Sequence, residues 1–250
     1  SGTSYQARVI ALVYVHVLAQ MRLGWLGPTD DTPLAVSGET DGPGDDARVE
    51  FGENHPFVEV QAKHGLNAGA QLDEMVKRVQ TKSRPGEQTK VVLVVDRDSS
   101  RKIHKDLASD LNRLRTGRQD GLKAETLKLI DRLGEESSLL QRIFIVPVDV
   151  DRTSDPELKT AIHLLSLVLE QPEQAVAAIS VLIADAGDVC ARKLRRTRKE
   201  LVDLLAGSKI KVRPPVKDDR WHRQLDFCRQ LLDRQHSEPA LSFLRKLANE

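Results

Sequence analysis

Metal-assisted phosphodiester hydrolysis needs oxygen ligands for the cation and a basic group beside the attacking water. Two neighbouring segments of this chain, residues 45–50 and 57–63, carry side chains of these types. The second segment alternates polar and apolar residues, which is typical of a β-strand with one buried face. Its polar positions fall on one face of that strand, and they are Glu59, Gln61 and Lys63. We therefore expect this polar face to line a site.

The first segment opens with two carboxylates, and strand alternation selects between them. Ala47 and Val49 form its apolar face, so Asp46 falls on the opposite face while Asp45 falls on the buried one. We therefore prefer Asp46 over Asp45 as the carboxylate ligand of Mg²⁺ or Mn²⁺, with the side-chain carbonyl of Gln61 as a second ligand. The plainer alternative is that the two aspartates only shape a turn.

Other residues near these two segments suit supporting roles. Lys63 is the candidate catalytic residue, because a lysine beside a bound cation orients the nucleophile or stabilises developing charge. Glu39 precedes the turn and can supply a further oxygen, and Glu59 and Asp45 are accessory candidates. Taken alone, Lys63 is better explained as a solvated strand residue, and its place on one face with Gln61 favours the catalytic role.

The order of the expected elements indicates an α/β fold, with a mixed sheet flanked by helices over residues 1–152. Residues 90–96 and 143–148 are continuous apolar runs, which are typical of strands buried on both faces. The other expected elements of this part are strands at 34–37, 46–51 and 57–63 and helices at 4–24, 67–82, 101–115 and 124–133.

Residues 153–250 are expected to form a helical extension that leads into further domains outside this chain. The expected helices are 156–170, 173–186, 188–206 and a segment from 219 onward, with an extended link at 211–215.

Composition excludes several classes of protein. The chain has 250 residues and a formal net charge of +1, so it is not an overtly basic nucleic-acid binder. Its two cysteines, Cys190 and Cys228, make no disulfide framework, which favours a reduced, cytoplasmic setting. The apolar run at 9–20 is too short to span a bilayer, so we expect a buried helix and no membrane partner.

A basic run at residues 192–199 is the densest charge cluster in the chain. On a helix it is able to contact DNA phosphates without sequence specificity. The alternative is a solvated helix face paired with Glu200 and Asp203. The candidate DNA contacts are Arg192, Lys193, Arg195 and Arg196.

Two further positions have both a structural and a functional interpretation. His64 follows Lys63 with opposite alternation, so a strand-end role is favoured over a ligand role. The segment 96–98 follows an expected buried strand, where ligands often bind in α/β sheets, but a strand-to-helix turn is the simpler interpretation.

The spacing of Asp46, Gln61 and Lys63 resembles the PD-(D/E)xK nuclease signature in its Gln variant, as found in Mrr-like restriction enzymes. With Gly2 to Arg8, Glu39 and the pair Asp45-Asp46 in order, residues 2–96 resemble the N-terminal double-stranded DNA endonuclease domain of bacterial antiphage effectors. Those effectors join such a nuclease to a cyclic-oligonucleotide sensor or a STAND NTPase.

The resemblance implies a restriction-endonuclease-like fold. It also implies metal binding by Asp46 and Gln61, catalysis by Lys63, and accessory roles for Glu39 and Gln6. One departure matters: the commoner motif has an acid at the position of Gln61, and an amide is a weaker metal ligand.

These observations lead to one main hypothesis, a Mg²⁺- or Mn²⁺-dependent endonuclease that cuts double-stranded DNA in antiphage defence. Because one subunit offers one site, cutting both strands implies a homo-oligomer. Control is expected from a sensor or NTPase domain outside this chain. The alternatives are a catalytically inactive interaction or oligomerisation module on the same fold, and a nucleotide- or RNA-processing enzyme.

Overall fold

The computed structural model describes residues 2–27, 32–52, 57–82, 89–152 and 154–214. The chain divides into two compact units, Ser1–Val212 and Arg213–Glu250, and the fold described below is that of the first. The helix expected from residue 219 onward lies outside the described residues, as does Cys228.

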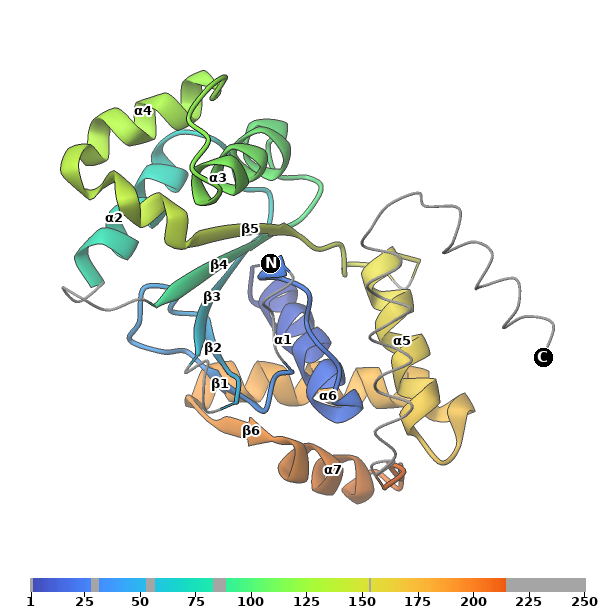
Figure 1. Cartoon of the computed structure of the whole chain (residues 1–250). Coiled ribbons are helices and arrows are strands. Elements are labelled where there is room, and N and C mark those ends of the chain that lie inside the picture. Colours follow the sequence, from blue (N-terminus) through green and yellow to red (C-terminus); the bar gives the residue numbers. More distant parts are fainter. Residues whose placement is uncertain (1, 28–31, 53–56, 83–88, 153, 215–250) are drawn as a thin grey trace. The chain divides into compact units, whose positions relative to one another are not determined.

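A six-stranded mixed sheet forms the centre of this unit (Figure 1). Its strands lie side by side in the order β5-β4-β3-β2-β1-β6. Strands β3, β4 and β5 run parallel, whereas β2, β1 and β6 pair antiparallel with their neighbours. The bounds are β1 Ala35–Gly38, β2 Ala47–Glu50, β3 Val58–Lys63, β4 Lys90–Val95, β5 Ile143–Pro147 and β6 Arg195–Thr197.

Helices cover both faces of the sheet and create two apolar cores. On one face, α1 (Gly2–Ala19) packs against α5 (Pro156–Val168) and α6 (Ala175–Arg192). The other face is covered by α2 (Ala70–Lys82) and α3 (Ala108–Arg115), and Figure 1 shows α4 on the same side.

Because side chains alternate along the strands, β3 and β4 contribute residues to the two cores. Val58, Val60 and Ala62 of β3 join the core around α1. Val91, Leu93 and Val95 of β4 join the core around α2, while Val92 and Val94 face α1. Strand β4 is therefore buried on both faces, as its continuous apolar run predicts. The expected α/β class with a mixed sheet and flanking helices is confirmed.

Most expected elements form within a few residues of their predicted bounds. The first helix ends at Ala19 instead of near Gly24, and Gln20 follows with a positive φ. The expected helix at 101–115 consists of a π-helical turn, Lys102–Leu107, followed by α3. Helix α4, Ala124–Leu133, has its predicted bounds. A 3₁₀ segment, Gly134–Arg142, then leads into β5.

The predicted break between helices at residue 187 is wrong. Helix α6 continues to Arg192, and Lys193 ends it in the left-handed conformation. The chain then forms β6 before α7 (Arg198–Gly207) begins at a capping box made by Thr197 and Glu200. The free edge of β1 supplies partners for β6, so sheet pairing overrides the local helical pattern.

The expected boundary after residue 152 lies inside the first compact unit, which extends to Val212. Helices α5, α6 and α7 share one core with α1, and β6 extends the central sheet. The helical segment that follows β5 is therefore an integral part of this unit.

One helical segment, Pro172–Arg192, is long and apolar enough to cross a membrane by length and composition alone. Its most apolar window is 44% buried inside the protein, where α6 packs against α1. The first helix is shorter, and its apolar residues lie in the core, as expected for a buried helix.

Candidate active site

The β2–β3 pair positions the predicted metal ligands. Ala47 of β2 lies opposite Val60 of β3 in an antiparallel register, which brings Asp46 to the level of Gln61. The Asp46 carboxylate oxygen Oδ2 accepts a 2.7 Å hydrogen bond from the amide of Ala62. Because Ala62 lies between Gln61 and Lys63, this contact anchors the carboxylate beside both predicted partners.

Burial makes the Asp46 carboxylate costly to ionise. Desolvation raises its pKa to about 6, and the Ala62 amide and the positive charge of Lys63 act in the opposite direction. A cation bound at this carboxylate would favour its ionised form for the same electrostatic reason. The group therefore has the chemistry of a metal ligand that is poorly compensated by the protein alone.

Gln61 has an unused acceptor in the same region. The side chain is 1% exposed, and its Nε2 donates a 3.1 Å hydrogen bond to Asp45 Oδ1. Its carbonyl oxygen Oε1 is buried and has no hydrogen-bond partner among the described residues. A buried orphan acceptor is unfavourable and calls for an explanation. A divalent cation is one group that would satisfy it.

Asp45 has a different task from Asp46. Its carboxylate pairs with Arg78 of α2 and accepts the hydrogen bond from Gln61. Its φ is positive, at 21°, which places it in the tight turn before β2. Asp45 therefore orients Gln61 and joins the turn to α2, so its predicted place on the apolar face is wrong, because the turn redirects its side chain toward α2.

Lys63 is half-buried at the end of β3 and lines a pocket of about 250 Å³. The pocket opens between the end of β3 and helix α2, on the polar face of β3 predicted from strand alternation. Its lining residues are Gln61, Lys63, His64, Leu66, Gln71, Glu74, Met75 and Arg78. Asp46 is not among these residues.

Gln6 and Glu39 hold the backbone of Asp46. Gln6, which is 9% exposed on α1, donates from Nε2 to the Asp46 carbonyl at 3.3 Å. The amide of Glu39 donates to the same carbonyl at 2.9 Å, and the Glu39 side chain is exposed. Both predicted accessory residues thus contact Asp46 through its main chain in this structure.

Glu59 lies on the predicted face of β3 but is engaged elsewhere. It is fully buried, and its Oε1 pairs with Arg48 Nη2 at 2.7 Å while its Oε2 accepts from Thr40 Oγ1 at 2.5 Å. Gly42 and Gly44 pack directly against it, where an added Cβ would approach within 2.4 to 2.7 Å. Glu59 therefore fixes the acidic turn and does not line the pocket.

The basic run folds as β6 and its flanks, with ion-pair partners that differ from the predicted ones. Arg195 pairs with Glu50 at 2.5 Å, and Arg196 pairs with the buried Asp185 at 2.7 Å. Lys193 Nζ lies 3.4 Å from Asp41. Glu200 instead caps α7, so the predicted pairing with that residue is replaced by partners that the sheet brings in.

A second group of ionisable residues gathers at the carboxyl edge of the parallel strands. His64, Asp96 and Asp151 approach one another there. The sequence interpretation assigned His64 to a strand end and Asp96 to a turn, and it did not single out Asp151. The only available signal was that each residue closely follows a buried strand.

No protein-family model matches the sequence, and no curated protein matches it significantly. Solved structures do match the fold. One is the Cap4 SAVED/CARF-domain containing receptor of Moraxella osloensis, with a TM-score of 0.52 and 14% identity over 83% of this chain and 47% of that one. Another is the Acinetobacter baumannii Cap4 SAVED/CARF-domain containing receptor with the cyclic trinucleotide 2′3′3′-cAAA, with a TM-score of 0.55 and 12% identity.

The match to the Acinetobacter receptor covers 83% of this chain and 45% of the receptor. This chain therefore spans less than half the length of the receptors that it resembles. At this level of identity the similarity establishes a shared fold.

Proposed function

We propose that this chain is a metal-dependent endonuclease domain that hydrolyses phosphodiester bonds of double-stranded DNA. The observation that carries the proposal is that a half-buried Asp46 carboxylate with a raised pKa lies at the level of Gln61, whose Oε1 is an orphan acceptor on the next strand. Lys63 follows two residues after Gln61 and contributes its charge to the environment of Asp46. These are the three residue types that such chemistry requires.

The chemistry divides between the cation and the chain. Asp46 and Gln61 would hold Mg²⁺ or Mn²⁺, and when bound the ion lowers the pKa of a water and neutralises phosphate charge. The Lys63 ammonium orients the attacking water by hydrogen bonding and stabilises negative charge on the phosphate oxygens. Asp45 keeps the Gln61 amide turned so that its carbonyl remains available.

A role in antiphage defence is supported by the fold shared with the Cap4 receptors, one of which is described with a cyclic trinucleotide. We place the sensor in a part of the protein outside this chain, because this chain spans less than half of such receptors. Cutting both DNA strands would use two copies of the site, and hence a homo-oligomer.

The test is digestion of supercoiled plasmid DNA with Mg²⁺ or Mn²⁺ at concentrations where light scattering reports an oligomer. We expect Asp46→Ala and Lys63→Ala to lower cleavage at least about a hundredfold, the usual scale for loss of a catalytic acid–base group. Gln61→Glu restores the commoner acidic ligand and should retain cleavage with tighter metal binding. Lys105→Ala removes an exposed lysine elsewhere and should cut like the wild type.

Equal cleavage by all variants would show that Asp46 and Lys63 do not form the active site. Absence of cleavage by an oligomeric wild type with either metal would favour the non-catalytic interaction module. An RNA substrate in parallel distinguishes the RNA-processing alternative.

One observation favours a second function, that of a receptor for a cyclic oligonucleotide. The similar Acinetobacter structure contains the cyclic trinucleotide 2′3′3′-cAAA. Calorimetric titration of this chain with that compound tests the alternative. Binding by this chain alone would locate sensing within residues 1–250, whereas our proposal expects no binding.

A further inference from the structure

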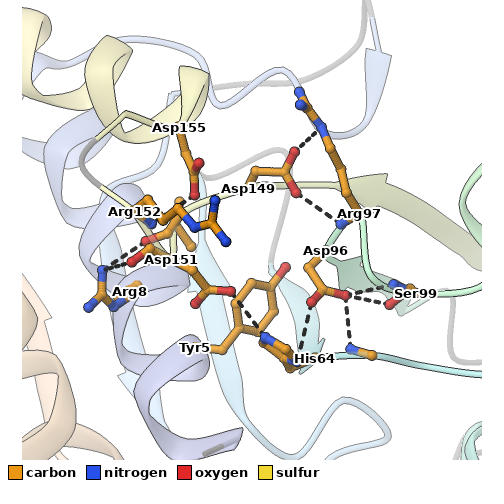
Figure 2. Close-up of polar contacts among 12 residues, drawn as sticks. Tyr5, Arg8, His64, Asp96, Arg97, Ser99, Asp149, Asp151, Arg152 and Asp155 are labelled. Carbon is orange, nitrogen blue, oxygen red and sulfur yellow. Dashed lines mark hydrogen bonds and ion pairs between the residues drawn. The ribbon is translucent and has the colours of Figure 1, made fainter.

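The parallel strands bring a histidine and two aspartates to one edge of the sheet. His64, Asp96 and Asp151 follow β3, β4 and β5, whose carboxyl ends lie together because the three strands are parallel. Figure 2 shows the three side chains converging beside Tyr5 of α1. One ligand atom from each of the three lies within 4.8 Å of the other two.

The imidazole of His64 lies between the two carboxylates. Its Nδ1 is 3.3 Å from Asp96 Oδ2, and its Nε2 is 3.1 Å from Asp151 Oδ2. The side chains of His64 and Asp151 are each 41% exposed, whereas that of Asp96 is 4% exposed. The group is thus buried at one end and open to solvent at the other, so that an ion can enter.

Asp96 is held firmly through one carboxylate oxygen, and its other oxygen faces His64. Its Oδ1 accepts hydrogen bonds from the amides of Gly65 and Ser99, at 2.9 and 3.0 Å, and from Ser99 Oγ at 2.6 Å. Its Oδ2 is buried and accepts no hydrogen bond from the described residues. This oxygen points toward His64 (Figure 2). The hydrogen bonds from Gly65 and Ser99 are the kind of outer support that orients a metal-binding carboxylate.

The surrounding residues also fix the other members of the group. Arg8 of α1 donates to the carbonyls of Val150 and Asp151, at 3.0 and 2.9 Å, and so holds the segment after β5. The Tyr5 ring meets the His64 imidazole edge-on at 5.7 Å. Burial raises the Tyr5 pKa, and the negative charges of Asp96, Asp149 and Asp151 raise it further, so the environment favours a cation.

A nearby third carboxylate is already neutralised. Asp149 pairs with Arg97 and accepts a 2.9 Å hydrogen bond from the Arg97 amide. This leaves Asp96 and Asp151 as the two carboxylates that face one histidine, a set with net negative charge.

We propose that His64, Asp96 and Asp151 form a binding site for a divalent transition-metal ion of the Zn²⁺ or Mn²⁺ class. Imidazole with carboxylates suits such ions better than Mg²⁺, which prefers oxygen ligands. The bound ion joins the ends of β3 and β4 to the segment after β5. None of its ligands belongs to the Asp46–Gln61 pair, although His64 lines the same pocket as Gln61 and Lys63.

The experiment measures bound Zn²⁺ by equilibrium dialysis and elemental analysis on an Asp46→Ala parent, which lacks the other proposed cation site. We expect His64→Ala and Asp151→Asn each to weaken Zn²⁺ binding at least about tenfold and to remove one equivalent of tightly bound metal. The matched control is His163→Ala, because His163 is an exposed histidine on α5 outside this group. It should keep the stoichiometry of the parent.

A second measurement distinguishes a metal site from a purely structural ion pair. Co²⁺ added to the parent should give visible absorption bands that are lost in His64→Ala, while circular dichroism shows both proteins folded. Absence of Zn²⁺ binding by the parent would overturn the proposal. Equal binding and equal Co²⁺ spectra in the parent and both ligand variants would also overturn it.

Discussion

The carboxylate of Asp46 accepts a 2.7 Å hydrogen bond from the main-chain amide of Ala62. This single contact fastens the turn before β2 to the last residues of β3, which carry Gln61 and Lys63. It also holds an ionisable group in a half-buried position, where desolvation raises its pKa to about 6. The carboxylate needed for the proposed metal binding therefore lowers the stability of the metal-free protein, and the free energy of unfolding measures this cost.

We predict that Asp46→Asn stabilises the protein at pH 8 in EDTA by up to about 3 kcal/mol. The pKa of Asp46 is raised in the folded state, from 3.8 to about 6. The folded protein therefore binds more protons than the unfolded chain between these values, and stability falls as pH rises through this window. Asparagine does not titrate and still accepts from the Ala62 amide.

Urea unfolding at pH 4 and pH 8 measures the effect, and the advantage of the variant should be small at pH 4. Asp203→Asn, at an exposed position on α7, serves as the control and should change stability little at either pH. An equal effect of Asp46→Asn at both pH values would contradict an ionised, buried carboxylate.

The Arg48–Glu59 pair should matter more for stability than a comparable pair on the surface. Glu59→Ala should lower the free energy of unfolding by about 2–4 kcal/mol, because it removes the buried carboxylate that pairs with Arg48 and accepts from Thr40. Glu50→Ala breaks the more exposed pair with Arg195 and should cost at most about 1 kcal/mol. Chemical denaturation of both variants makes the comparison, and equal losses would refute it.

Close packing between β1 and α6 predicts a clash at Gly38. A Cβ added there would lie 2.5 Å from the carbonyl oxygen of Val189, which is main chain and has little room to move. Gly38→Ala should therefore cost at least about 1–3 kcal/mol. Gly187→Ala lies on α6 with nothing within 4 Å of the new atom and should stabilise by up to about 1 kcal/mol. Thermal unfolding checks the opposite signs.

The basic run should show two different behaviours. Arg196→Gln removes the partner of Asp185, whose side chain is 7% exposed, and should lower the free energy of unfolding by about 2–3 kcal/mol. Arg192→Gln lies at an exposed position and should leave stability within about 0.5 kcal/mol. If Arg192 contacts DNA phosphate, this variant lowers the salt dependence of DNA binding by about one unit of slope.

Strand alternation predicted much of the candidate site. The division of β3 into an apolar face and a face carrying Glu59, Gln61 and Lys63 agrees with the two cores and the pocket. Alternation was wrong for Asp45, which contacts Gln61 and Arg78 of α2 on the polar side of β3 and not the apolar face. The choice of Asp46 over Asp45 as metal ligand therefore stays a prediction. The division of β3 was predictable because the face of a strand residue follows from its position along the chain.

The errors came from partners that are distant in the sequence. Residues 195–197 lie in a charged segment with a helical pattern, yet they pair with β1 because its edge is open. Glu59 has the correct face, but Arg48 and the Thr40 hydroxyl engage it. Neither outcome follows from the local pattern, because both depend on which backbone edge or charged group is brought alongside.

By itself, the sequence determined the α/β class, the buried central strand β4 and the candidate residues Asp46, Gln61 and Lys63, because these follow from local periodicity and residue chemistry. The strand predicted at 143–148 is the edge strand β5 and is buried only in its first half. Only the tertiary structure decided that Asp45 pairs with Arg78, that β6 joins the sheet, and that His64 meets Asp96 and Asp151. The last group joins residues up to 87 positions apart. Parallel strand packing brings them together, and no spacing along a chain encodes that proximity directly.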